Sequence, residues 1–274
     1  MTLTTRPLSE PFSTLSYRTA GTGTPLVLLH GVGMQSAAWE PQIAALSQGA
    51  HVVALDMPGH GGTAPLPKGA ELPDYVNWLH AALTALDLGP VNLAGHSMGA
   101  LIAGGYAITH PQMVQRVALL NGVFRRTDAA RAAVVARAKE LETGAPDLDT
   151  PLKRWFSDSP SDQAARDLVE GWLKAVDLDG YATAYGAFAT GDQHYADAWS
   201  DIDCPLLALT GSDDPNSTPA MAEEMARIAQ NGHTHIVAGH RHMANLTAVE
   251  EVNRVLADWL SWPVAGHHQR RTSA

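Results

Sequence analysis

A serine flanked by glycines is the strongest chemical signal in the sequence. The motif GHSMG at residues 95–99 follows a short apolar run at 91–95 and precedes a helical pattern at 100–110. A sharp strand-to-helix turn of this kind exposes a serine hydroxyl at the end of a sheet, and the glycines let strand and helix approach closely. We therefore predict Ser97 as a nucleophile.

A serine hydroxyl is a weak nucleophile and needs a base, oriented in turn by an acid. In proteins with this kind of turn, the acid comes after the serine in the sequence and the histidine comes after the acid. Asp214 comes just after the apolar run 205–210, at the end where strands of a parallel sheet carry functional sites, and His242 follows the run 234–237. Asp213 and His240 are the alternatives for these two roles.

Acyl transfer also requires hydrogen-bond donors for an oxyanion. One predicted donor is the backbone N–H of Met98, directly after the nucleophile. The other is the N–H of Val32, in the loop HGVGM at residues 30–34. His30 opens that loop and is a candidate substrate-binding residue; a strand-ending turn with a satisfied histidine also explains it, and both explanations can hold together.

The elements that must position these residues alternate between buried strands and helices, which indicates a mostly parallel α/β sheet. An early antiparallel strand is expected at 12–20. Buried strands are expected at 25–30, 51–56, 91–95, 117–121, 205–210 and 234–237, with helices at 36–46, 72–88, 100–110, 219–229 and 246–260. The alternation of strands and helices is interrupted from 124 to 199, where the apolar residues show only helical spacing. We expect a core at residues 1–123 and 200–262, a helical insertion at 124–199, and a disordered tail at 263–274.

Composition and net charge argue against several classes of function. The 274 residues carry a formal net charge of −10, which disfavours binding to nucleic acid or to an anionic membrane surface. Cys204 is the only cysteine, and a lone thiol suits a reducing compartment. The polar start has no apolar signal core. We expect a cytoplasmic protein with no nucleic-acid or membrane partner; no pattern sets an oligomeric state.

Five stretches resemble the α/β-hydrolase superfamily: LLHGVGMQSAAW (28–39), DMPGHGGT (56–63), GHSMGA (95–100), GSDDP (211–215) and HMANL (242–246). The resemblance covers residues 12–262. It implies the α/β-hydrolase fold, a mostly parallel central sheet flanked by helices, with a helical lid inserted after the sixth strand. The family's acid stands three residues after a glycine, which selects Asp214 over Asp213. The register of the last helix favours His242 over His240.

Segments within 124–199, among them Arg154-Trp155-Phe156 and Gly180-Tyr181-Ala182, resemble the 3-oxoadipate enol-lactonases. That resemblance implies hydrolysis of a small carboxylic ester or lactone through an acyl-enzyme on Ser97. Hydrolysis of a carbon–carbon bond in ring-cleavage products and cofactor-free perhydrolysis are the alternatives within the fold. A non-catalytic ligand-binding module or receptor is the alternative of another class, although the complete set of triad positions argues against it.

Further candidates for substrate binding lie in the insertion. Arg125, directly after the sixth strand with Arg126, and Arg154 could each pair with an anionic substrate, and Trp155 adjoins Arg154. A solvated helix face is the alternative for each arginine. Two histidines, at 233 and 235, would share one face of a strand, yet no carboxylate or cysteine nearby completes a zinc set. We expect no metal and no cofactor.

Overall fold

The computed structural model describes residues 3–144 and 147–264. Apart from residues 263 and 264, the tail expected at 263–274 lies outside the described residues. Of the helices in the described part of the chain, none combines the length and the apolar character that crossing a membrane requires.

Eight strands form one sheet within the described residues, in the order β1-β2-β4-β3-β5-β6-β7-β8. Strands β1 and β2 pair antiparallel, as do β2 and β4, and all other neighbours are parallel. The strands are β1 (Leu3–Pro7), β2 (Thr14–Ala20), β3 (Pro25–Leu29), β4 (His51–Leu55), β5 (Val91–His96), β6 (Val114–Leu120), β7 (Leu206–Gly211) and β8 (Gly232–Val237). The parallel part of the sheet agrees with the runs expected from the sequence.

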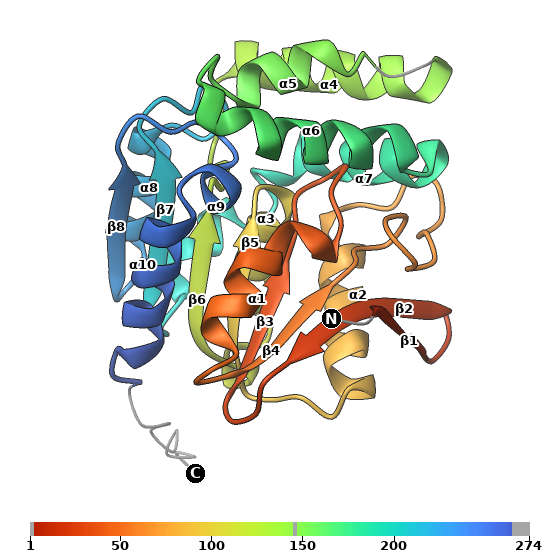
Figure 1. Cartoon of the computed structure of the whole chain (residues 1–274). Coiled ribbons are helices and arrows are strands. Elements are labelled where there is room, and N and C mark those ends of the chain that lie inside the picture. The colour runs from red at the N-terminus through yellow and green to blue at the C-terminus, as the bar shows by residue number, and fades with distance from the viewer. Residues whose placement is uncertain (1–2, 145–146, 265–274) are drawn as a thin grey trace.

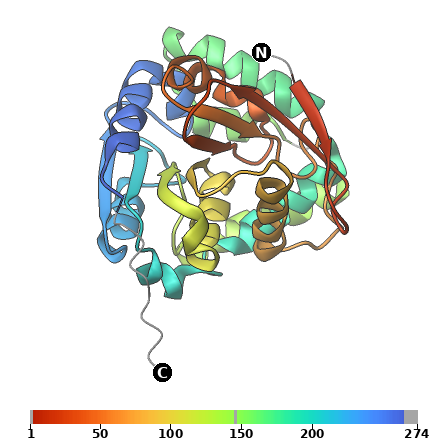
Figure 2. The ribbon, with the colours of Figure 1, turned by 90° about the horizontal axis from the view of Figure 1, so that it is seen from below.

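Helices cover both faces of this sheet, which is why its central strands are apolar on both sides (Figures 1 and 2). On one face, α1 (Glu40–Leu46) and α10 (Val249–Ser261) bury Ile43 and Trp259 against the strands. On the other face lie α2 (Leu72–Ala85), α3 (Met98–Thr109) and α8 (Pro219–Ile228), whose buried side chains belong to a second core cluster. The sheet is thereby fixed between two packed layers.

Helices α4 (Asp128–Thr143), α5 (Asp149–Trp155), α6 (Pro160–Ala175) and α7 (Leu178–Gly191) come between β6 and β7. We call these four helices the helical insertion. A short 3-10 helix, η3 (Ala196–Asp201), leads from it back to the core. The insertion lies over the carboxyl ends of the parallel strands, as Figure 1 shows. It therefore covers the end of the sheet at which the predicted site residues gather.

Three elements differ from the sequence-based expectation. Strand β1 was not predicted, because all its residues are exposed and no apolar alternation marks it. The helix expected at 36–46 divides into η1 (Ser36–Trp39) and α1. The helix expected at 246–260 divides into α9 (Ala244–Thr247) and α10. None of these differences moves a predicted site residue to another element.

Candidate active site

Ser97 occupies a strained turn between β5 and α3. Its backbone has φ 54° and ψ −114°, a conformation that non-glycine residues rarely adopt. The glycines beside it are required sterically. A Cβ atom at Gly99 would lie 2.3 Å from the carbonyl oxygen of Leu29, and one at Gly95 would lie 2.0 Å from the carbonyl oxygen of Gly99. The turn therefore lifts Ser97 from a strand and helix that nearly touch.

The three predicted triad side chains lie in one hydrogen-bonded line. His242 Nε2 lies 3.1 Å from Ser97 Oγ, and His242 Nδ1 lies 2.8 Å from Asp214 Oδ2. All three residues are at most 4% exposed. Since a carboxylate only accepts, Nδ1–H donates to Asp214 and Nε2 is left to accept the serine proton.

Asp214 is held as an anion by the donors around it. Its Oδ2 also accepts from Asn121 Nδ2 at 2.8 Å, and its Oδ1 accepts from the N–H groups of Asn216 at 2.8 Å and Ser217 at 3.1 Å. Burial by itself would raise the pKa of this carboxyl. His242 and the hydrogen bonds from Asn121 and Asn216 outweigh burial, so the pKa lies below its ordinary value.

The two alternative residues point elsewhere. Asp213 is exposed, and its Oδ1 accepts from Ser212 Oγ at 2.7 Å. The Nδ1 atom of His240 lies 2.9 Å from Thr247 Oγ1. The geometry therefore brings Asp214 and His242, and not their neighbours, to Ser97.

The backbone of His242 is also fixed. The buried ring of His96 lies beside that of His242, with ring centroids 5.0 Å apart. His96 Nε2–H donates to the carbonyl oxygen of His242 at 2.8 Å. Burial lowers the pKa of His96 to about 3, so its ring is a neutral donor.

The loop expected to hold the oxyanion is braced by two buried histidines. Gly33 N–H donates to His60 Nε2 at 2.8 Å, and Met57 N–H donates to His30 Nε2 at 2.9 Å. Burial lowers the pKa of His30 to about 4 and that of His60 to about 3, so both rings are neutral acceptors. Val32 lines the cavity above Ser97. Met98 is the first residue of α3, where an N–H has no acceptor within its own helix.

This bracing corrects one prediction. His30 does not line the cavity: its Nδ1–H donates to the carbonyl oxygen of Gly31 at 2.8 Å and its Nε2 is used by Met57. Both ring nitrogens of His30 are thus hydrogen-bonded to backbone groups. The strand-ending turn, which was the alternative explanation, describes His30, and the structure does not support a substrate contact.

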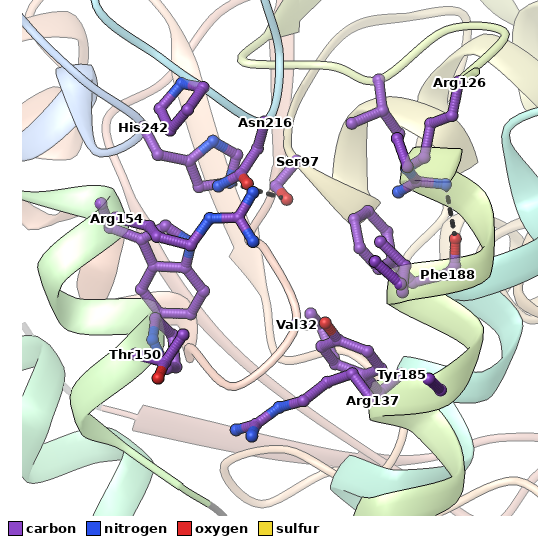
Figure 3. Close-up of a pocket in the computed structure, with 18 of the residues that line it drawn as sticks. Val32, Ser97, Arg126, Arg137, Thr150, Arg154, Tyr185, Phe188, Asn216 and His242 are labelled. Atoms are coloured by element: carbon purple, nitrogen blue, oxygen red, sulfur yellow. Dashed lines mark hydrogen bonds between the residues drawn. The ribbon is translucent and has the colours of Figure 1, made fainter. Parts of the chain in front are cut away.

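A cavity of about 620 Å³ lies between the triad and the helical insertion. The core contributes Val32, Ser97 and His242 to its wall (Figure 3). From the insertion and the segment leading to it, the wall receives Arg126, Thr150, Arg137, Arg154, Trp155, Tyr185 and Phe188. The insertion therefore supplies most of the groups that a bound molecule would meet away from Ser97.

Three arginines give this cavity its polar character. Arg126 is paired with the buried Asp192 at 2.9 Å, and Arg137 lies 3.8 Å from both Glu140 and Asp147. Arg154 also lines the cavity, and it makes no ion pair within residues 3–144 and 147–264. Burial raises the pKa of the Tyr185 hydroxyl, and all three arginines act against that rise. The cavity can therefore stabilise negative charge near Tyr185.

Arg125 is a second correction. Its guanidinium donates to Asp197 Oδ1 at 2.9 Å and to the carbonyl oxygen of Ala196 at 3.2 Å, and it does not line the cavity. The residue adopts a left-handed backbone conformation, φ 44°. Arg126, its neighbour, faces the cavity in its place.

Asn121 and Arg137 are two of the residues at the site that had no role in the sequence-based prediction. Asn121, which holds Asp214, ends the apolar stretch VALLN at the carboxyl end of β6. A polar residue there, at the end of the strand that pairs with β5 just before Ser97, is a signal that could have been used. Arg137 gave no such signal, because an arginine on a helix of ordinary polarity is most often solvated.

The histidines considered for zinc are engaged with other side chains. His235 Nε2 lies 2.7 Å from Glu251 Oε1, and the ring of His233 lies against that of Trp262 with centroids 4.6 Å apart. Among the described residues, no group of three or more His, Cys, Asp or Glu side chains could hold a metal ion.

Comparison with known proteins identifies the family. The sequence model of the alpha/beta hydrolase family matches residues 26–255. The chain is 53% identical to (E)-2-((N-methylformamido)methylene)succinate hydrolase of Acinetobacter baylyi over 247 aligned residues. The alignment covers 90% of this chain and 94% of that protein.

Solved structures show the same fold. The enol-lactonase from Burkholderia xenovorans superposes with a TM-score of 0.81 at 26% identity, over 91% of this chain and 97% of that one. A thermophilic esterase from Thermogutta terrifontis has a TM-score of 0.85 at 20% identity, over 95% and 98%. The predicted fold class is confirmed, and the chain belongs to the alpha/beta hydrolase family.

Proposed function

We propose that this protein hydrolyses an acyl bond of a small anionic substrate through an acyl-enzyme on Ser97. The observation that carries the proposal is the hydrogen-bonded line Ser97–His242–Asp214, which opens into a cavity lined by arginines. We further propose that the helical insertion acts as the lid of this cavity.

Each step of the reaction has a group in place. His242 Nε2 takes the proton of Ser97 as Oγ attacks the substrate carbonyl, and Asp214 holds Nδ1–H and offsets the positive charge on the ring. The N–H groups of Val32 and Met98 stabilise the oxyanion. The protonated His242 then gives its proton to the leaving oxygen or nitrogen. Water, deprotonated by His242, cleaves the acyl-enzyme and restores Ser97.

The substrate class follows from the arginines together with the relatives. The name of the Acinetobacter relative specifies a succinate that carries an N-formyl enamine, and the Burkholderia protein is an enol-lactonase. Both compounds join an acyl group to a heteroatom on a carbon–carbon double bond. We propose that this protein cleaves such a bond, with Arg154 and Arg137 near the carboxylates.

Between the two linkages, the relative at 53% identity favours the N-acyl enamine. The carboxylic ester or lactone expected from the sequence stays the second candidate. Carbon–carbon hydrolysis and perhydrolysis use the same triad and have no separate observation in their favour.

A substrate panel tests the proposal. The panel holds (E)-2-((N-methylformamido)methylene)succinate, an enol-lactone carboxylate and a neutral short aryl ester, each offered to the wild type and to Ser97→Ala. We expect turnover of an anionic compound that is lost in the variant. A fluorophosphonate should label the wild type at Ser97, which a non-catalytic binding module would not show. Equal hydrolysis by wild type and variant would contradict the role of Ser97.

A further inference from the structure

Arg241, the residue before His242, connects the catalytic loop to the helical insertion. Its Nη1 donates to the carbonyl oxygen of Phe156 at 2.7 Å and to that of Lys153 at 2.9 Å. These carbonyls lie at the end of α5, where a helix has no internal donors and where its dipole favours a cation. These two bonds therefore connect Arg241 to segments that precede it in the chain by 85 and 88 positions.

The backbone of Arg241 is fixed on the triad side. Asn121 Nδ2 donates to Asp214 at 2.8 Å and lies 3.3 Å from the carbonyl oxygen of Arg241. One residue thus has its main chain tied to the acid of the triad and its side chain tied to α5. A displacement of α5 would be transmitted directly to the position of His242.

Helix α5 in turn places two side chains at the reacting centre. The indole of Trp155 stacks on the imidazole of His242, with ring centroids 5.9 Å apart and an interplanar angle of 28°. Arg154 lines the same cavity, and in Figure 3 its guanidinium points toward the part that holds Ser97 and His242. The last two residues of α5 therefore face the substrate and the base together.

Helix α5 depends on outside contacts for its position. It has seven residues, and a helix this short is not stable alone in water. Leu152 anchors it by burial, and the bonds from Arg241 hold its carboxyl end. Loss of Arg241 would leave that end, with Arg154 and Trp155, without its charged partner.

We propose that Arg241 is a positioning residue that locks α5 onto the catalytic loop, so that Trp155 holds the imidazole of His242 and Arg154 faces the substrate carboxylate. The inference rests on the proposed function for its reaction and deepens it. Binding of the substrate anion and alignment of the base are then set by one helix, and they fail together when the connection is cut.

The test measures how fast a small neutral fluorophosphonate labels Ser97. Labelling requires Ser97 and His242 but no carboxylate on the probe, so the rate reports the base alone. The final extent of labelling gives the folded fraction, independently of the rate. The variants are Arg241→Ala, Arg241→Lys and a control, Arg254→Ala, at an exposed position of α10.

We expect Arg241→Ala to label at least about tenfold more slowly while reaching the same final extent, because a misplaced base lowers the rate of attack. Added guanidinium should restore part of the rate, Arg241→Lys should lie in between, and Arg254→Ala should match the wild type. With the anionic substrate, Arg241→Ala should lower kcat and raise KM together. A wild-type labelling rate in Arg241→Ala, or a reduced extent with an unchanged rate, would overturn the proposal.

A double variant tests the coupling itself. If Arg241 acts through Trp155, then Arg241→Ala combined with Trp155→Leu should label no more slowly than the slower single variant. Multiplied losses would show two independent effects and overturn the coupling. A wild type that fails to label would overturn the proposed function and this inference with it, whereas a labelled wild type with an unaffected Arg241→Ala would overturn the inference alone.

Discussion

At the scale of single residues, two adjacent carboxylates in the loop after β7 have opposite environments. Asp214 is buried and accepts from His242, whereas Asp213 is exposed and accepts from Ser212. Replacing Asp214 by Asn removes the charge that orients His242 and should lower kcat by about 10⁴-fold with the fold intact. Steady-state kinetics on the best substrate of the panel checks this.

Asp213→Asn is the matched control, since it makes the same chemical change one residue away. It should leave kcat within about twofold of the wild type, because exposed substitutions away from a site have small effects. Similar losses in both variants would mean that the loop as a whole, and not the contact between Asp214 and His242, sets the rate.

A second prediction at this scale concerns Arg154. Its guanidinium faces the cavity and has no ion-pair partner in the described part of the chain. Arg154→Ala should raise KM for an anionic substrate at least about tenfold, since a charge-assisted hydrogen bond contributes about 1.5–3 kcal/mol. Hydrolysis of the neutral aryl ester should change little. Arg125→Ala, outside the cavity, is the control, and an equal KM increase there would refute a direct contact by Arg154.

Single residues also show where sequence reasoning reaches its limit. The contact between Ser97, Asp214 and His242 could be expected from the sequence, because each residue stands in a short motif that follows the end of a strand. Arg125 and Arg126 could not be separated, because which of two consecutive side chains faces a cavity depends on one backbone angle. His30 could not be assigned either, since its partner, Met57 N–H, lies 27 residues away in the sequence.

At the scale of elements, the strands that could be predicted are those buried on both faces. Residues 25–30 and 205–210 are continuous apolar runs, and β3 and β7 follow them within one residue at each end. Strand β1 is exposed throughout and is held by its backbone hydrogen bonds to β2. A side-chain pattern in the sequence does not predict such pairing. The break at 124–199 indicated inserted helices, but not which of their side chains would reach the cavity.

The docking of helix α7 supplies a prediction at this scale. Gly180, in its first turn, meets the loop before α2: a Cβ atom there would lie 2.6 Å from the Cα atom of Gly59. Gly180→Ala should therefore push the insertion away from the core. It should lower the free energy of unfolding by about 1–3 kcal/mol and reduce activity. Urea unfolding and kinetics measure the two effects.

Gly186 in the same helix is the matched control. A Cβ atom there would meet nothing within 4 Å, so Gly186→Ala should raise the free energy of unfolding by about 0.5–1 kcal/mol through helix propensity. If Gly180→Ala were equally stabilising, the close contact between α7 and the loop would not constrain the insertion.

At the scale of the whole molecule, stability depends on keeping three histidines neutral in the interior. Burial lowers the pKa of His30 to about 4 and the pKa values of His60 and His96 to about 3, from an ordinary value of 6.5. Between about pH 6.5 and pH 4, these three histidines are therefore protonated in the unfolded chain but neutral in the folded chain. The free energy of unfolding is therefore not reduced by these histidines above pH 6.5, and it decreases as the pH falls below 6.5.

The size of this effect makes it measurable. Each histidine contributes about 1.4 kcal/mol per pH unit in that window, so the three together should lower the free energy of unfolding by about 4 kcal/mol per unit. Typical domains have a total stability of about 5–15 kcal/mol, so we expect stability to fall steeply below pH 6.5 and acid unfolding at or below about pH 5. Urea unfolding at pH 7.5, 6.5 and 5.5 tests this. His60→Gln, which keeps an acceptor for Gly33 N–H, should reduce the slope by about a third, and a stability that stays constant from pH 7.5 to 5.5 would show that the buried rings accept protons without unfolding.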